Sequence, residues 1–136
     1  MDEIIIYTDG ASRGNPGPAG IGVVLCTRKG EIIQEISEHL GTATNNIAEY
    51  TAVIRGLEAA ALLKAKRATV VSDSQLMVRQ MTGEYKVKNE GLIPLHHRIR
   101  QLACAFEGVE FVHIPRERNQ RADRLSKKGS MGEPEI

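Results

Sequence analysis

The sequence lacks the patterns that mark several classes of protein, beginning with those built on cysteine. It has two cysteines, Cys26 and Cys104, which are far apart and form no C-x-x-C pair. A redox motif of that type is thereby excluded, and the lack of any cluster of histidine and cysteine excludes a zinc site. The two thiols fall in segments predicted as a strand and a helix, so we expect them to be reduced, buried and inert.

A long apolar run is also missing, since none approaches the roughly 20 residues that a membrane-spanning helix requires. The first residues, Met1-Asp2-Glu3, lack the basic start of a signal peptide. We therefore expect a soluble, cytoplasmic protein that does not bind membranes. No apolar surface stripe is left over once the core is assigned, which favours a monomer.

Strong charge of one sign is absent as well. The formal net charge is +1, which is too low for a protein that binds nucleic acid over its whole surface. Any such contact must then be local. Residues 116–128 form the one clearly basic stretch, which predicts either that local contact or a solvated helix face.

The length and composition fit one domain with one core, because the chain has 136 residues, 41% of them hydrophobic and 26% charged. We find no repeat, linker or low-complexity segment. We predict a single domain over residues 1–128 and a flexible tail over residues 129–136.

Hydrophobic periodicity and turn residues predict five strands and four helices. The expected strands lie near residues 4–9, 20–27, 31–40, 69–72 and 109–114, and the expected helices near residues 45–61, 75–81, 95–106 and 119–128. This order indicates an α/β fold, with a five-stranded mixed sheet in which parallel strands follow three antiparallel ones, flanked by helices. Such a sheet places its chemistry at the ends of strands.

Four acidic residues come from four separate elements that can converge on one edge of this sheet. Asp9 and Asp73 end strands, Glu49 lies one turn into the first helix, and Asp123 lies in the last helix. Carboxylates crowded together repel unless a cation sits between them, and hard divalent ions prefer oxygen ligands. The set therefore predicts a site for Mg²⁺ or Mn²⁺. Taken singly, each acid also has a structural explanation, as a helix cap, a turn residue or a solvated side chain.

Four segments in order resemble the type 1 ribonuclease H family over nearly the whole chain. They are Y-T-D-G-A-S-R-G-N-P-G-P-A-G at 7–20, T-N-N-I-A-E-Y at 44–50, S-D-S-Q at 72–75 and R-E-R-N-Q-R-A-D-R-L-S at 116–126. The resemblance implies a ribonuclease H-like fold and an endonuclease that cuts the RNA strand of RNA/DNA hybrids. It also implies that Asp9, Glu49, Asp73 and Asp123 bind two metal ions with the substrate, leaving 5′-phosphate and 3′-hydroxyl ends.

The resemblance assigns the polar residues around the acids to substrate binding. Asn15, Asn45 and Gln75 match positions that contact the minor groove of the hybrid, where amides can bond to 2′-hydroxyl groups. Asn15 and Asn45 can equally serve as a turn residue and a helix cap. Further backbone or phosphate contacts are expected from Gly10, Ser12, Arg13, Asn46 and Ser74.

The chain departs from the common family pattern in two places, and in both it resembles the archaeal-like branch of the family. The loop before the last helix has no histidine, and we expect Arg116 to contact the scissile phosphate in its place, while His113 is structural. Residues 83–95 are too short for the basic protrusion that some relatives use to hold the DNA strand. We expect weaker, more salt-sensitive substrate binding, partly compensated by the basic cluster near the C-terminus.

Three other functions compete with this interpretation. The fold could serve as a binding module that has lost catalysis, although the four intact acids argue against it. A resolvase-like or transposase-like nuclease would act on DNA, whereas the amide side chains favour RNA. A small-molecule enzyme would use the first Gly-rich loop for phosphate, but that loop is not G-x-G-x-x-G and opens no helix.

Overall fold

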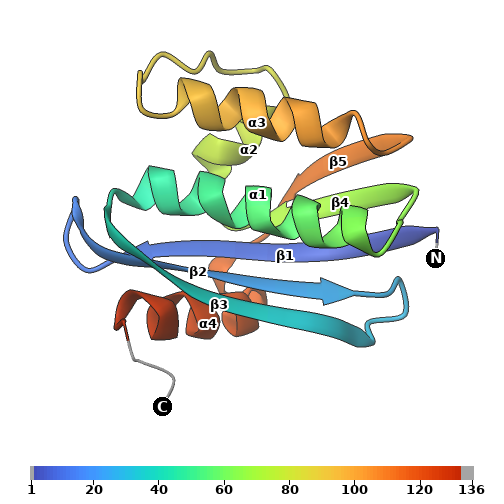
Figure 1. Cartoon of the computed structure of the whole chain (residues 1–136), viewed down its shortest axis with the longest axis horizontal. Helices are drawn as coiled ribbons and strands as arrows, with labels where there is room; N and C mark the ends of the chain where they lie inside the picture. Colours follow the sequence, from blue (N-terminus) through green and yellow to red (C-terminus); the bar gives the residue numbers. More distant parts are fainter. Residues whose placement is uncertain (1, 133–136) are drawn as a thin grey trace.

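The computed structural model describes residues 2–132, and Figure 1 shows helices packed on a single sheet. The elements in chain order are β1 (Glu3–Ser12), β2 (Gly17–Cys26), β3 (Ile32–Ala43), α1 (Asn45–Leu62), β4 (Arg67–Ser72), α2 (Gln75–Met81), α3 (Ile93–Ala103), β5 (Gly108–His113), the 3₁₀ turn η1 (Arg116–Arg118) and α4 (Gln120–Ser130). The strand order is β3-β2-β1-β4-β5, with β1, β2 and β3 antiparallel and β4 and β5 parallel to β1. The predicted α/β fold with a mixed five-stranded sheet is confirmed.

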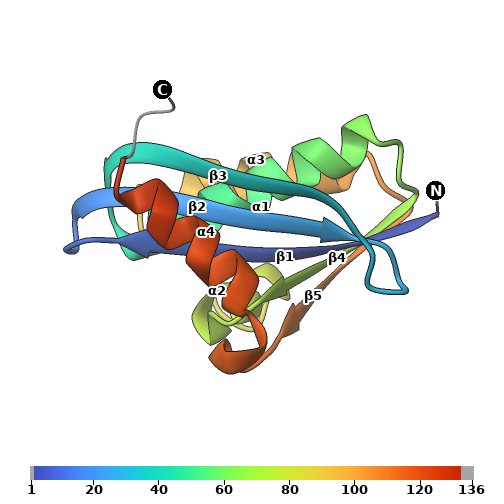
Figure 2. The same ribbon diagram turned by 90° about the horizontal axis from the view of Figure 1, so that it is seen from below.

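The two faces of the sheet are covered by different helices. On one face α1 packs against β1 and β2, and α3 packs against α1; Figure 2 shows α4 on the opposite face. The core between α1 and the sheet is apolar and includes Ile6, Val23 and Leu57, all with no exposed surface. Gly56 lets α1 approach closely, because a Cβ there would meet the side chains of Ile6 and Val23. The missing Cβ at Gly56 thus allows the helix to lie directly against the sheet.

The other face owes its close packing to glycines. A Cβ on Gly20 or Gly22 of β2 would run into the backbone of α4, and a Cβ on Gly129 of α4 would run into the backbone of Glu38 in β3. Side chains larger than hydrogen would hold the helix away from the strands. The missing Cβ atoms therefore fix the height of α4 above the sheet.

Side-chain caps account for the start of two of the helices. Thr44 caps α1 by accepting a hydrogen bond from the Ile47 N–H at 3.1 Å, and Ser74 caps α2 by accepting one from Met77. Helix α4 extends to Ser130, two residues beyond the expected end of the domain, and Gly129 and Ser130 are buried. The last part of the expected tail, residues 133–136, lies outside the described residues.

Two expectations from the sequence are wrong. Asp9 does not end its strand, because β1 continues to Ser12 and stays paired with β2 over residues 9–12. Cys26 is buried, but Cys104 is exposed, because it follows the last turn of α3 on the side that faces away from the core. The segment between α2 and α3 forms turns and irregular chain, and within the described part of the protein it holds no helical protrusion.

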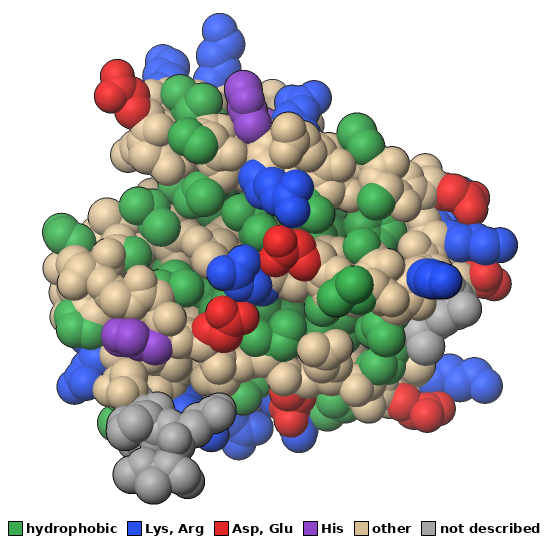
Figure 3. All heavy atoms as spheres, viewed as in Figure 1, with side chains coloured by type: hydrophobic (Ala, Val, Ile, Leu, Met, Phe, Trp, Pro, Cys, Tyr) green, Lys and Arg blue, Asp and Glu red, His purple; other side chains and the backbone are tan. Residues whose placement is uncertain are grey.

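The surface carries charges of both signs. Figure 3 shows basic and acidic side chains interspersed on the face that carries α1 and α3. Arg55 of α1, for example, pairs with Glu38 at 3.3 Å and with Glu58 at 3.1 Å. Among residues 2–132, no helix is long and apolar enough to cross a membrane.

Candidate active site

Asp9 and Asp73 become neighbours through the register of two parallel strands. Thr8 of β1 pairs with Ser72 of β4, so Asp9, within β1, and Asp73, just after β4, lie side by side where β4 ends. Because β4 ends at Ser72, Asp73 begins the turn into α2. The strand pairing alone therefore brings two carboxylates together.

Glu49 reaches the same point from α1. The helix lies very close to β1 there, since a Cβ on Gly10 would run into the backbone of Ala48 and Glu49. The Gly10 N–H donates a hydrogen bond to Glu49 Oε1 at 2.7 Å, and the Ser72 hydroxyl donates one to Oε2 at 3.3 Å. Glu49 is only 7% exposed, and these two bonds fix its carboxylate.

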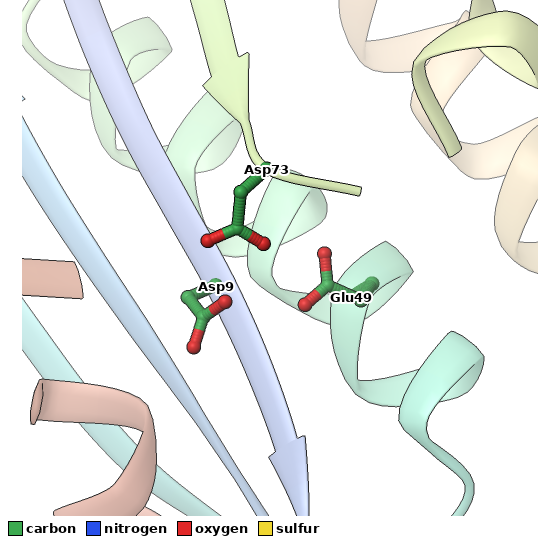
Figure 4. Close-up of side chains that lie close together, drawn as sticks. All are labelled: Asp9, Glu49 and Asp73. Atoms are coloured by element: carbon green, nitrogen blue, oxygen red, sulfur yellow. The ribbon is translucent and has the colours of Figure 1, made fainter. Parts of the chain in front are cut away.

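The three acids form a compact cluster, which Figure 4 shows with their carboxylates turned toward one another. One oxygen from each of Asp9, Glu49 and Asp73 lies within 4.8 Å of the other two. Burial raises the pKa of Asp9 to about 7, and the nearby Asp73 and Asp123 charges add to this, while the Ser126 hydroxyl opposes it. Burial, followed by the Asp9 charge, raises the pKa of Glu49 well above its usual range.

This donor set suits a hard divalent cation. All the ligand atoms are carboxylate oxygens, and a cation between them would offset both the burial and the mutual repulsion of the charged forms. The described residues contribute no sulfur or imidazole ligand to the cluster. The residues present therefore fit Mg²⁺ or Mn²⁺ better than a softer metal.

Asp123 lies apart from that cluster, at the rim. It projects from the first turn of α4 and pairs with Lys127 Nζ at 3.1 Å and with Arg116 Nη2 at 3.8 Å. Its side chain is 17% exposed, whereas that of Arg116 is 75% exposed. The structure thus brings three of the four predicted acids close enough together to share a metal ion. The fourth, Asp123, is paired with two basic side chains.

The carboxylates face a cleft of about 560 Å³. It is lined by Asp9, Gly10, Ala11, Ser12, Arg13, Asn45, Asn46, Glu49, Asp73, Ser74, Arg116, Asp123, Lys127 and Ser130. The lining combines the acids with amide, hydroxyl and basic side chains. A ligand that carries both hydroxyl and phosphate groups would find partners for each.

Some of the expected substrate-binding residues line the cleft, and others lie behind or beside it. Asn45 lines the cleft and accepts a hydrogen bond from the Ser12 N–H at 2.9 Å. Asn15 stands behind it, where its side-chain oxygen accepts a bond from the Asn45 N–H at 3.1 Å. Asn15 and Gln75 are exposed and do not line the cleft, although Gln75 follows the lining residue Ser74.

The residue expected to replace the loop histidine lies on the cleft rim. Arg116 begins η1, three residues after His113, which is exposed at the end of β5. The fixed positive charge of Arg116 is thus available to an anion in the cleft.

Three residues that hold the acids were not identified from the sequence. Asn119 bonds to Asp73, Ser126 to Asp9, and Ser72 to Glu49. Asn119 and Ser126 lie four residues before and three after Asp123, which is the spacing of one helix face, and that spacing was the available signal. Ser72 alternates in a strand like any core residue and gives no such signal.

A mixed sheet with acidic side chains from β1, β4 and α1 at one edge defines the class of ribonuclease H-like proteins. Residues 7–129 match the family described as reverse transcriptase-like. The chain therefore belongs to this family.

Similarity to individual proteins places the chain in the type 1 ribonuclease H group of this family. The chain is 44% identical to a protein of Mycobacterium tuberculosis named as bifunctional, over 91% of this chain and 34% of the relative. The crystal structure of RNase H1 from the archaeon Halobacterium salinarum superimposes with a TM-score of 0.93 at 40% identity, covering 96% of this chain and 99% of that one. The structure of LC11-RNase H1 in complex with RNA/DNA hybrid gives 0.90 at 46% identity, covering 95% and 97%. The chain thus spans about a third of the length of the mycobacterial relative.

Proposed function

We propose that this protein is a metal-dependent endonuclease that hydrolyses the RNA strand of RNA/DNA hybrids. The observation that carries the proposal is the cluster of Asp9, Glu49 and Asp73 at one edge of the sheet, with ligand oxygens within 4.8 Å of one another. A relative of the same fold, LC11-RNase H1, has been solved with an RNA/DNA hybrid. The cleft beside the cluster offers groups for both ribose hydroxyls and phosphates.

Asp9, Glu49 and Asp73, with Asp123 at the rim, would hold two Mg²⁺ or Mn²⁺ ions when substrate is bound. Such ions activate water for in-line attack on phosphorus and stabilise the departing 3′-oxygen, which leaves 5′-phosphate and 3′-hydroxyl ends. The protein itself positions these carboxylates and excludes solvent from two of them, since Asp9 is 5% and Glu49 7% exposed.

Substrate recognition falls to the residues around the first loop and the start of α1. Asn45 offers amide donors and acceptors to 2′-hydroxyl groups, and Asn15 fixes its backbone by a hydrogen bond at 3.1 Å. Arg13 and Asn46 line the same cleft, and Gln75 lies at the start of α2 next to it. None of these groups distinguishes one base from another, so we expect cutting with little sequence preference.

Arg116 is proposed to contact the scissile phosphate from the rim. A guanidinium is always charged at neutral pH, so it can attract the phosphate and the product but cannot carry a proton. Its contact with Asp123, at 3.8 Å, is loose enough to be exchanged for a substrate oxygen. Cytoplasmic location and the monomeric state stay predictions.

The proposal is tested by the cleavage of a labelled RNA/DNA hybrid in Mg²⁺, in Mn²⁺ and in chelator. Asp73→Asn should abolish metal-dependent cutting, because it removes a metal ligand. The protein should stay folded by circular dichroism, because Asp73 is only partly buried. Asp2→Asn, which changes an acid with a 90% exposed side chain, is the matched control and should cut like the wild type.

Other outcomes would point to the competing functions. Binding of the hybrid without cutting in either metal would make the protein an inactive binding module. Cutting of duplex DNA in preference to the hybrid would make it a DNA nuclease of the same architecture. Single-stranded RNA should remain intact, since it lacks the DNA strand that defines the hybrid.

A further inference from the structure

Three polar side chains of α4 and its N-cap lie on one face of the helix, toward the acidic cluster. Asn119 precedes its first turn, Asp123 follows four residues later and Ser126 three after that. Asn119 and Ser126 are 2% and 0% exposed, and each contacts a different carboxylate: Asn119 that of Asp73, just after β4, and Ser126 that of Asp9, within β1. Neither side chain is among the residues that line the cleft.

Asn119 is held in one orientation by two acceptors. Its Nδ2 donates to the backbone oxygen of Thr8 at 2.9 Å and to Asp73 Oδ2 at 3.2 Å. Since both partners can only accept, the amide nitrogen must be on that side, and the opposite flip would break both bonds. The remaining oxygen, Oδ1, is buried and has no partner within residues 2–132. A buried polar atom left unpaired opposes folding, so this orientation is kept against a local cost.

Ser126 does for Asp9 what Asn119 does for Asp73. Its hydroxyl contacts Asp9 Oδ2 and also lies 2.8 Å from the backbone oxygen of Asp123. The single hydroxyl proton goes to the stronger acceptor, which is the carboxylate when Asp9 is ionised. The backbone oxygen of Asp123 is a second acceptor, so the hydroxyl stays in place when its proton is shared between this oxygen and Asp9.

We infer that Asn119 and Ser126 are positioning residues, which each fix one oxygen of a carboxylate so that the other is presented to a divalent cation. A carboxylate with one oxygen held has a defined direction for the second, and such outer partners commonly tune metal sites. Because Gly20 and Gly22 have no Cβ, α4 packs directly on β2. This packing holds Asn119 and Ser126 at a fixed position relative to the two carboxylates. This inference rests on the proposed function of the site.

The test is the binding of Mn²⁺ alone to the metal-free protein, measured by calorimetry, together with kcat and KM on the hybrid. Ser126→Ala and Asn119→Ala should each weaken Mn²⁺ binding about 10-fold or more, as outer-partner substitutions do at other metal sites. They should lower kcat at saturating hybrid and leave KM within about twofold, because neither residue lines the cleft.

Ser37→Ala is the matched control for a general loosening of the helix. The Ser37 hydroxyl donates to the backbone oxygen of Leu125 at 2.7 Å, so it ties β3 to α4 without contacting a carboxylate. Mn²⁺ affinity should be unchanged in this variant. An equal loss in Ser37→Ala and Ser126→Ala would overturn the inference, as would wild-type Mn²⁺ affinity in Ser126→Ala.

Two further variants keep the test decisive if alanine disrupts folding. Ser126→Cys retains nearly the same volume with a weak donor and should lose Mn²⁺ affinity as Ser126→Ala does. Asn119→Leu fills the space that alanine leaves; if neither Asn119 variant folds, that residue is structural and its positioning role is withdrawn. Calorimetry needs no substrate, so the Mn²⁺ result stands even if the wild type fails to cut the hybrid and the proposed function fails.

Discussion

Asp9→Asn should make the metal-free protein more stable at pH 8, although it removes a proposed metal ligand. Asp9 has a pKa of about 7 in the folded protein against 3.8 for the free residue, mainly because it is buried. At 1.36 kcal/mol for each pKa unit, this difference amounts to about 4 kcal/mol against the charged form at high pH. Asparagine is neutral and can still accept the Ser126 hydrogen bond.

The gain should depend on pH in a defined direction. Because the folded-state pKa is raised, the stability linked to Asp9 is fully present below about pH 4 and is lost as pH rises through about 7. Since part of the effect is shared with neighbouring acids, we expect Asp9→Asn to gain about 2 kcal/mol at pH 8, less than half of that at pH 5 and little near pH 4. In a domain of this size, 2 kcal/mol corresponds to a rise in Tm of about 7 °C.

The assay is thermal unfolding in chelator from pH 5 to pH 8, repeated with millimolar Mg²⁺ or Mn²⁺. Added metal should stabilise the wild type more than the variant and so narrow or reverse the difference. The exposed acid variant Asp2→Asn should show no such dependence on pH. A variant that is less stable than the wild type in chelator at pH 8, or a difference that is constant with pH, would refute the reasoning.

Three other predictions concern the ends of helices and the packing of α4. Lys127→Ala combined with Lys128→Ala should flatten the dependence of hybrid affinity on salt, measured by fluorescence anisotropy; an unchanged slope would show that the cluster does not contact phosphates. Thr44→Ala should lower the free energy of unfolding in urea by about 1 kcal/mol through loss of the α1 cap, and a neutral result would contradict it. Gly22→Ala should cost about 2 kcal/mol or more, because its Cβ would meet the backbone of α4 at Ala122; an unshifted Tm would mean that the helix can move away freely.

The sequence was sufficient for the order of elements and for the acidic set. Asp9 and Asp73 follow β-prone runs, so the parallel pairing of those runs puts both at one edge, and α2 was expected at the residues it occupies. The resemblance supplied the role of Glu49, which periodicity alone would have left as a solvated helix residue.

The contacts that hold these acids could not be predicted, since they depend on how closely the helices approach the sheet. Gly10, Gly20 and Gly22 set those approaches by lacking a Cβ, and nothing in a local pattern says which backbone each will meet. The exposure of Cys104 could not be predicted for the same reason. Which side of a helical segment is buried depends on the element that it packs against, and the sequence does not identify that element. The pairing of Asp123 with Lys127 is a local i,i+4 contact and was within reach of the sequence.

The contacts from α4 also bear on when the chain acquires a working centre. Thr8 and Asn119 are 111 residues apart in sequence, and Asp9 and Ser126 are 117 apart. Such contacts form only when nearly the whole chain has folded together. Contacts between residues so far apart in sequence are the slowest to form during folding. During synthesis, the strands that carry Asp9 and Asp73 leave the ribosome well before the helix that fixes them. A nascent or half-folded chain would therefore hold its acids without the geometry that the proposed metal site requires.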